Sequence, residues 1–128
     1  MILLDTCTIL WLALDQSQLS NIAKDVIDSG SQKLFLSSVS ALEIGRLYQH
    51  KKLQLPLTPD EWLEKNMELL NILEIPIHNK EAILSTKLPY HHNDPADRII
   101  IATALQYNLN ILTPDKYIKN YTEINTIW

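Results

Sequence analysis

The chain is poor in residues that cross-link or loosen a fold. Its 128 residues include one cysteine and two glycines. One thiol excludes an internal disulfide and a zinc site built from several thiolates, and it fits a reducing compartment. We interpret Cys7 as a small buried side chain rather than a catalytic thiol. Because glycine is scarce and no repeat or low-complexity tract is present, residues 1–128 are predicted to form a single domain without flexible linkers.

Long apolar runs are also absent. The longest, Thr8 to Leu14 and Ile99 to Leu105, are too short to span a bilayer, and Met1 leads directly into strand-like sequence without a basic leader region. We therefore expect a cytoplasmic protein with no membrane partner. The formal net charge of −4 argues against nucleic-acid binding through a general basic surface. It does not exclude a nuclease, because a metal ion would neutralise some of the acids.

Short apolar segments alternate with helical patterns along the chain. Strands are predicted at residues 2–5, Leu34–Ser37, Leu73–Ile77 and Asn110–Thr113, with a candidate fifth at Glu123–Ile127. Helices are predicted at Thr8–Leu14, Asn21–Ser29, Val39–Lys52, Pro59–Leu70, Lys80–Lys87 and Pro95–Tyr107. Such alternation implies right-handed crossovers. The prediction is a three-layer α/β fold, with a central parallel sheet of four to five strands and helices on both faces.

Local signals mark several helix ends. Ser20 is a candidate N-cap, Gly30 a candidate C′ residue, and Asp94 a candidate N-cap for the helix that begins at Pro95. Thr58-Pro59-Asp60-Glu61 has the T-x-x-E form of a capping box with proline at the first helical position. This segment is the clearest helix start in the chain.

Four acidic residues occur where a parallel sheet would gather them. Asp5 and Asp115 follow the first and fourth strands, Glu43 lies early in the helix after the second strand, and Asp97 lies in the first turn of its helix. Strand carboxyl ends and the amino ends of the following helices share one edge of such a sheet, where ligands bind. Four like charges there are unfavourable without a cation. Oxygen ligands on separate elements predict Mg²⁺ or Mn²⁺, and such a site suggests phosphoryl chemistry.

Some of these acids also have structural explanations. Asp97 could complement the helix macrodipole, and Asp115 could cap a short following helix. Glu43 lies on an apolar stripe, where an unpaired carboxylate is costly, although Arg46 could pair with it. The four acids together favour function more strongly than any one alone.

These motifs resemble those of the PIN-domain ribonucleases and, within them, the VapC-like toxins of prokaryotic toxin–antitoxin pairs. Ile2-Leu3-Leu4-Asp5-Thr6 is similar to the amino-terminal strand motif, and Ser37 to Ile44 is similar to the helix with the second acid. His92-Asn93-Asp94-Pro95-Ala96-Asp97-Arg98 matches the H-x-D-P-x-D-R signature of one VapC-like subgroup, and Thr113-Pro114-Asp115 matches a T-x-D motif after the fourth strand. The resemblance covers nearly the whole chain, with all four motifs in order.

The resemblance implies a PIN-like fold and a metal-dependent endoribonuclease. The catalytic acids, which would hold one or two Mg²⁺ or Mn²⁺ ions, are Asp5, Glu43, Asp97 and Asp115. The hydroxyls of Thr6 and Thr113 would support these ligands or position water. A metal-activated water would attack the phosphorus in line, leaving a 5′-phosphate and a 3′-hydroxyl.

The implied partners are an RNA substrate, a cognate antitoxin protein and a second copy of the chain in a homodimer. The stripe of Ile9, Leu12 and Ala13 is either ordinary core or, where exposed, a surface for such a protein. Two departures from the family pattern concern substrate fit and loop shape. Cys7 stands where the subgroup often has histidine, and His50-Lys51 stands where glycine is usual before Lys52-Leu53.

Positive charge for the RNA backbone is expected from side chains near the acidic edge. The candidates are Arg46, Arg98, Lys116, Lys51, Lys52 and Lys119. The last three are described equally well as solvated helix ends or ion-pair partners. Arg98 could instead pair with an acid and orient it. His92 could contact substrate or shuttle a proton, although a structural loop hydrogen bond is the stronger reading.

Other function classes fit the sequence less well. A receiver domain would be a phosphoacceptor with an acidic Mg²⁺ pocket, but it needs an aspartate after the third strand and a lysine after the fifth, and neither is present. A phosphatase with an Asp-x-Asp motif would need aspartate at Cys7. A PIN fold that has lost catalysis and only binds a partner is a third alternative, and the four acids argue against it.

Overall fold

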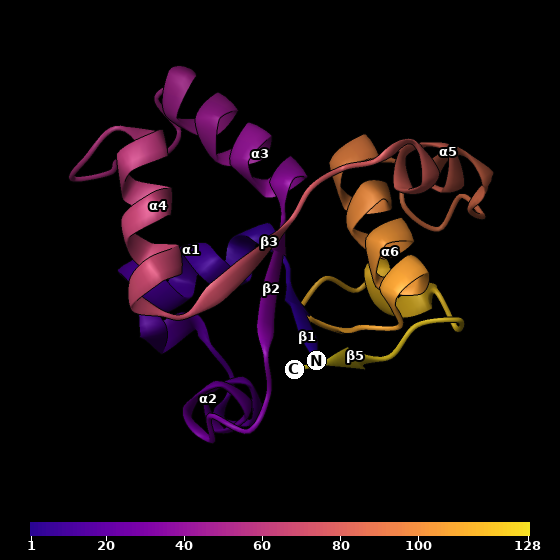
Figure 1. The fold of residues 1–128 in the computed structure, drawn as a ribbon, viewed down its shortest axis with the longest axis horizontal. Coiled ribbons are helices and arrows are strands. Elements are labelled where there is room, and N and C mark those ends of the chain that lie inside the picture. Colours follow the sequence, from indigo (N-terminus) through magenta and orange to yellow (C-terminus); the bar gives the residue numbers. More distant parts are fainter.

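The structure, a computed structural model that describes residues 1–128, contains one sheet of five short strands (Figure 1). The strands are β1 (Ile2–Leu4), β2 (Leu34–Ser37), β3 (Ile72–Ile75), β4 (Asn110–Leu112) and β5 (Thr126–Ile127). Their order across the sheet is β3-β2-β1-β4-β5, and every neighbouring pair is parallel. The predicted parallel sheet is therefore confirmed, including its fifth strand, which is shorter than expected.

The strand order decides against the receiver alternative. Receiver domains have the doubly wound order 2-1-3-4-5, in which the third strand lies beside the first. Here β3 pairs with β2 at the edge of the sheet, and β1 lies between β2 and β4. The receiver interpretation is wrong for this chain.

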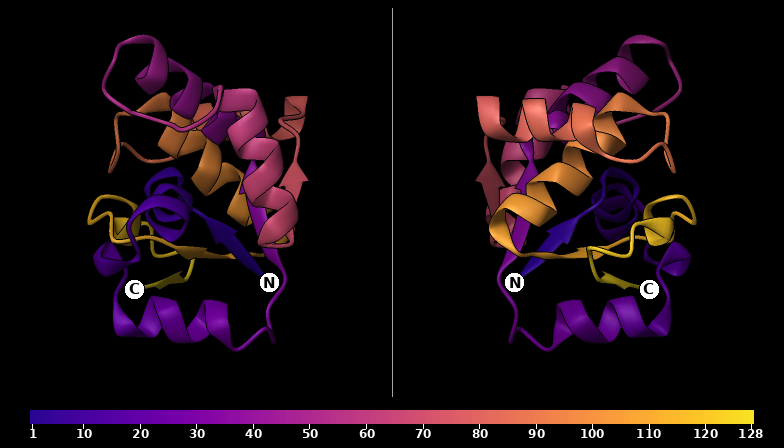
Figure 2. Two further views of the ribbon diagram at one scale, coloured as in Figure 1. Left: turned by 90° about the vertical axis from the view of Figure 1, so that its left-hand side faces the viewer. Right: turned by 90° about the vertical axis from the view of Figure 1, so that its right-hand side faces the viewer.

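Six helices cover both faces of the sheet, as predicted (Figures 1 and 2). They are α1 (Thr6–Leu14), α2 (Asn21–Asp28), α3 (Ser38–Gln49), α4 (Pro59–Leu69), α5 (Asn79–Lys87) and α6 (Pro95–Tyr107), with 3-10 turns at Gln16–Gln18 and Ile118–Asn120. Helices α1, α2 and α4 lie on one side of the sheet, α5 and α6 lie on the other, and α3 contributes Ile44 to the first core and Val39 to the second. None of the helices combines the length and the apolar character needed to cross a bilayer.

Alternating side chains of β1 anchor two separate cores. Ile2 and Leu4 pack under α1 to α4, whereas Leu3 packs under α6 on the opposite face. Each of these fully buried side chains contributes roughly 1.5–3 kcal/mol relative to exposure. Ile9 and Leu12 belong to the first core, so the stripe on α1 is mainly ordinary core rather than a partner surface.

Several helix ends differ from the predicted ones. Helix α1 begins at Thr6 rather than Thr8, because Asp5 is itself the N-cap and accepts a hydrogen bond from the Thr6 N–H. Helix α3 ends at Gln49, and Lys51 then has a left-handed backbone with φ of 58°. This is the conformation that glycine adopts most readily, so a lysine here forms the loop shape for which glycine was expected.

The cap predictions had mixed outcomes. Ser20 accepts from the Ala23 N–H, Asp94 accepts from the Ala96 N–H, and Gly30 has φ of +62°, so these three predictions are confirmed. The capping box at Thr58 is wrong, because the Thr58 side chain makes no cap hydrogen bond. Helix α4 still begins there, since Pro59 presets the backbone and acidic residues in the first turn complement the helix dipole.

Candidate metal centre

The carboxyl ends of β1 and β4 bring two acidic segments together. These strands pair in register, with Leu4 opposite Leu112, and the Asp5 N–H donates to the Leu112 carbonyl at 3.3 Å. Asp5 and Asp115 therefore leave the sheet at the same edge. Helix α3, which follows β2, and the first turn of α6 carry Glu43 and Asp97.

Asp5 is buried and held by donors on both of its oxygens. Its Oδ1 accepts from the Thr6 N–H at 2.7 Å, and its Oδ2 accepts from the Thr113 hydroxyl at 2.6 Å. The Thr113 Oγ1 also accepts from the Asp115 N–H at 3.0 Å. One completely buried hydroxyl thus connects two of the acids.

Glu43 is joined to the same edge through Thr6. The Thr6 hydroxyl donates to the Glu43 Oε1 at 2.5 Å, and it lies 2.8 Å from the Ser40 hydroxyl. No ion pair joins Arg46 to Glu43, so the pairing considered from the sequence is not formed. The carboxylate on the α3 stripe is satisfied by a hydroxyl rather than by a cation.

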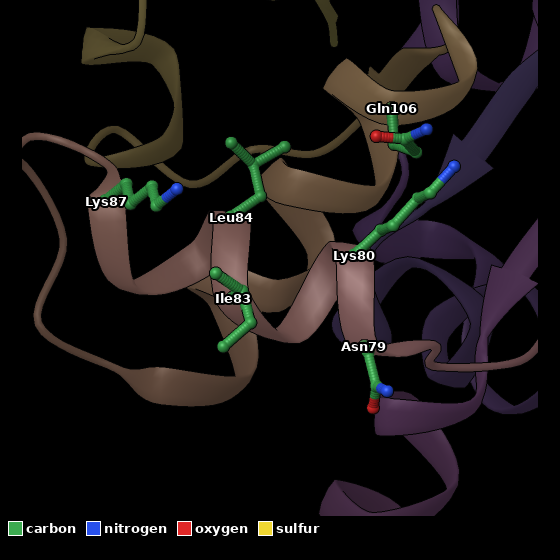
Figure 3. A pocket seen from close by; sticks show the side chains of 6 residues that line it. All are labelled: Asn79, Lys80, Ile83, Leu84, Lys87 and Gln106. Carbon is green, nitrogen blue, oxygen red and sulfur yellow. The ribbon is translucent and has the colours of Figure 1, made fainter.

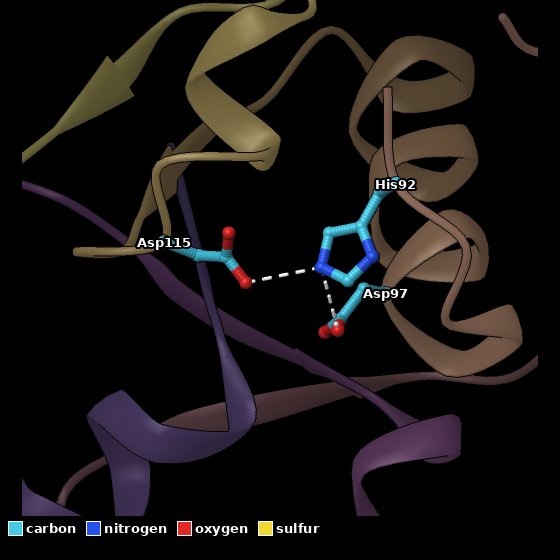
Figure 4. A group of neighbouring side chains, drawn as sticks. All are labelled: His92, Asp97 and Asp115. Carbon is cyan, nitrogen blue, oxygen red and sulfur yellow. Dashed lines mark hydrogen bonds and ion pairs between the residues drawn. The ribbon is translucent and has the colours of Figure 1, made fainter. Parts of the chain in front are cut away.

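Asp97 and Asp115 converge on the imidazole of His92, which lies between them (Figure 4). The His92 Nε2 lies 3.0 Å from the Asp97 Oδ2 and 3.0 Å from the Asp115 Oδ2. The other oxygen of Asp115 accepts from the N–H groups of Tyr117 and Ile118, so this acid also caps the turn that follows it. Both interpretations of Asp115, as a cap and as a site residue, are therefore compatible with its geometry.

Three of the four acids have pKa values raised above their ordinary range, so burial at this edge disfavours their charged forms. Burial raises the pKa of Asp5 and of Glu43. Burial, followed by the charges of Asp5, Glu43, Asp94 and Asp115, raises the pKa of Asp97 to about 8. Within 4.0 Å of a carboxylate, the only basic side chains in the molecule are the imidazoles of His78 and His92. No lysine or arginine neutralises this cluster at that distance.

Such a donor set fits a hard divalent cation. Carboxylate oxygens on separate elements are the ligands that Mg²⁺ and Mn²⁺ prefer, and a cation would remove the cost of gathering the charges. The neighbouring Cys7 does not provide a thiolate, because burial and the charge of Asp5 raise the pKa of its thiol. Its Sγ donates weakly to the Asp5 Oδ2 at 3.5 Å. The prediction that Cys7 is not a reactive thiol agrees with this environment.

The predicted substrate-binding cations have different positions. Arg46 is exposed and lines a groove with Glu43, whereas Lys116 is exposed and lies over the ring of Tyr117. Arg98 requires a correction, because only 6% of it is exposed and its guanidinium donates to backbone carbonyls instead of to an acid. Successive side chains do not share a helix face, so adjacency to Asp97 did not place Arg98 in the cluster.

A groove between α3 and the start of α6 leads away from the acids. It has a volume of about 460 Å³ and is lined by Glu43 and Asp94 together with Arg46, His50 and Lys52. A second hollow, of about 430 Å³, lies on α5 and α6 (Figure 3). Its lining is Asn79, Lys80, Ile83, Leu84, Lys87 and Gln106. Without a carboxylate, thiol or imidazole, this hollow offers no comparable metal chemistry.

Known proteins resemble this chain over nearly its whole length. Ribonuclease VapC22 of Mycobacterium tuberculosis is 26% identical over 130 residues, which cover 99% of this chain and 98% of VapC22. The structure of VapBC2 from Rickettsia felis bound to a promoter DNA fragment matches with a TM-score of 0.74 at 14% identity, over 99% of this chain and 98% of that chain. A toxin–antitoxin complex from Klebsiella pneumoniae matches with a TM-score of 0.66 at 22% identity, over 100% and 97%.

The match to a family model extends over nearly the whole sequence. The model of the PIN domain matches residues 2–124, which include all four acids. The chain therefore belongs to the PIN-domain family.

Proposed function

We propose that this chain is a Mg²⁺- or Mn²⁺-dependent endoribonuclease and the toxin of a toxin–antitoxin pair, in the VapC-like subgroup with the H-x-D-P-x-D-R motif. The proposal is supported by the end-to-end similarity to a ribonuclease and by the similarity in fold to a chain of a toxin–antitoxin complex. The observation that carries it is the convergence of acids with raised pKa values and no lysine or arginine within 4.0 Å.

Each residue of the centre has a distinct task in this proposal. The metal ligands would be Asp5, Glu43, Asp97 and Asp115. When bound, Mg²⁺ or Mn²⁺ supplies the Lewis acidity that makes water a competent nucleophile toward phosphorus. Thr113 and Thr6 hold the Asp5 and Glu43 carboxylates in place through hydrogen bonds.

The groove between α3 and α6 is the proposed path of the RNA strand. It connects the Glu43 side of the acidic centre with Arg46, His50 and Lys52, and none of these three is engaged in an ion pair. Arg46 and Lys52 at this position would contact phosphates next to the scissile bond and offset the repulsion between RNA and a chain of net charge −4. Lys116 would contribute from the Asp115 side.

A cognate antitoxin and a second copy of the chain are the proposed protein partners. Exposed apolar side chains such as Leu42, Leu73 and Ile83 are available for such contacts. Light scattering of the purified chain, alone and after co-expression with the product of an adjacent small gene, would measure both associations.

The central experiment compares wild type with Asp5→Asn and Asp97→Asn on total cellular RNA, in Mg²⁺ and in EDTA. Wild type in Mg²⁺ should leave 5′-phosphate ends, and each variant should be slower by more than about 100-fold, because it lacks an inner ligand. Asp28→Asn, an exposed acid of α2, is the matched control and should retain activity.

Equal cleavage by wild type, both variants and EDTA-treated protein would contradict the proposal. A wild type that binds Mn²⁺ but cleaves no RNA would favour the remaining alternative, a PIN-fold module that only binds a partner.

A further inference from the structure

The loop Leu88–Asn93, between α5 and α6, is held by a buried arginine. The Arg98 Nη1 donates to the carbonyls of Pro89 at 3.0 Å and His92 at 3.2 Å, and its Nη2 donates to those of Ser85 at 2.8 Å and Leu88 at 2.9 Å. No carboxylate lies within 4.0 Å of this guanidinium. A buried charge is tolerated only when its hydrogen bonds are satisfied, and here the backbone carbonyls satisfy them.

Tyr121 holds the same loop from the other side. Its side chain is almost completely buried, and its hydroxyl donates to the Pro89 carbonyl at 2.5 Å. The same oxygen accepts from the His92 N–H at 3.1 Å and from the Arg98 Nη1 at 3.4 Å. The N–H and the carbonyl of His92 are therefore both bound, by Tyr121 and Arg98 respectively.

The ring of His92 is oriented by a further bond. Its Nδ1 accepts from the Asp94 N–H at 3.1 Å, so the single proton of the neutral imidazole lies on Nε2. This nitrogen donates to the Asp115 Oδ2 at 3.0 Å, and the Asp97 Oδ2 lies at the same distance from it. Coordination of a metal through Nε2 would require the proton on Nδ1, where it would oppose the Asp94 N–H. His92 is thus built to donate to Asp115, with the Asp97 carboxylate beside the same nitrogen, and not to bind the ion.

We propose that Arg98 and Tyr121 are positioning residues of the metal centre, which hold the His92 ring so that it donates to Asp115 and packs its Nε2 against the carboxylate of Asp97. The inference rests on the proposed function, because it concerns the same acids. It predicts that loss of the Tyr121 hydroxyl weakens metal binding although this group contacts no metal ligand. Donors behind metal ligands typically change metal affinity 10- to 100-fold.

The test uses Mn²⁺ alone as the probe, with wild type, Tyr121→Phe, Arg98→Lys and the control Tyr48→Phe, an exposed tyrosine of α3 outside this network. Electron paramagnetic resonance should give a dissociation constant at least about tenfold higher for the first two variants and an unchanged one for the control. Pulsed measurements on wild type should show no directly coordinated histidine nitrogen. Hydrogen exchange of the His92 amide should be faster in Tyr121→Phe.

Tyr121→Phe removes one oxygen and keeps the ring, and its folding is verified by circular dichroism before titration. Unchanged Mn²⁺ affinity in folded Tyr121→Phe and Arg98→Lys, with wild type binding normally, overturns this inference and leaves the metal centre intact. A coordinated nitrogen signal in wild type that disappears in His92→Gln also overturns it, because His92 would then be a ligand. Absence of Mn²⁺ binding by wild type overturns the metal centre, and the inference with it.

Discussion

Asp5 and Glu43 are held by hydroxyl groups, whereas Asp97 and Asp115 are joined through an imidazole. The hydroxyl donors, Thr6 and Thr113, follow the neighbouring strands β1 and β4 and are buried at the sheet edge, where each reaches an acid far away in the sequence. The imidazole comes from a loop that is itself held by other residues. The first pair therefore depends on the sheet, and the second depends on the closure of the loop.

Thr113→Val should have the largest effect among these tests. It removes the one hydroxyl that contacts both Asp5 of the first pair and the backbone of Asp115 in the second. The substitution keeps the shape but leaves Asp5 Oδ2 with only the weak Cys7 thiol donor and the Asp115 N–H without its partner. We expect metal affinity to fall about 10- to 100-fold, and the free energy of unfolding in EDTA to fall by about 1–3 kcal/mol. Mn²⁺ titration and urea unfolding measure these quantities.

The matched control is Thr103→Val, which removes another buried threonine hydroxyl, one that donates to the Ile99 carbonyl within α6. It should leave Mn²⁺ affinity unchanged. Equal Mn²⁺ affinities for the two valine variants would show that Thr113 does not support the acids.

The pH dependence of metal binding should follow Asp97 in the imidazole-linked pair, because the pKa of Asp97 is raised to about 8 from an ordinary value of 3.8. A cation must displace this proton at neutral pH, so Mg²⁺ affinity should rise with pH up to about 8, by at most about tenfold per pH unit. Calorimetric titrations at pH 6, 7 and 8 measure the slope. An affinity that is flat over this range would contradict the assignment.

The same shift has a defined sign for stability. The folded protein without metal binds the Asp97 proton more tightly than the unfolded chain does, so this contribution is fully present below about pH 4 and is lost as pH rises through about 8. Urea unfolding in EDTA should reveal the decrease, and Asp97→Asn should abolish the part that comes from this residue.

Arg46→Gln tests whether the groove beside Glu43 carries the substrate. One lost phosphate contact should raise KM for RNA about three- to tenfold and reduce the slope of log KM against log salt by about 1, with kcat little changed. Steady-state kinetics at several salt concentrations measure both. Lys65→Gln, an exposed cation of α4, is the control, and an equal KM for the two variants would argue against this path.

Lys51→Gly should have the smallest effect on stability among these tests. It changes only the backbone just after α3, the helix that carries Glu43. Lys51 has φ of 58°, where a side chain is strained, so glycine should raise the free energy of unfolding by about 0.5–1 kcal/mol. Urea unfolding measures the change. Lys52→Gly, at a residue without positive φ, should not stabilise, and a destabilised Lys51→Gly would refute the explanation.

Much of the architecture was predictable because its signals are local. Alternating segments predicted the parallel sheet, and the positions of Asp5 and Asp115 after strands predicted their common edge, since parallel strands end together. The Thr58 capping box failed because a motif permits a hydrogen bond without requiring it. The partners of Arg98 were missed because they are backbone carbonyls of a loop, which no side-chain pattern reveals.

The sequence by itself determined which chemistry is available: acids after strands, threonines beside them and a histidine upstream of α6. Hydrophobic periodicity locates the strands and helices, and residue spacing then gives the direction of each side chain within its element. These two signals are enough to identify the residues of the site. Only the tertiary structure decided that His92 lies between Asp97 and Asp115 and that Arg98 faces away from the acids. Those contacts depend on how the loop closes against Tyr121, and loop closure is set by packing between segments far apart in the chain.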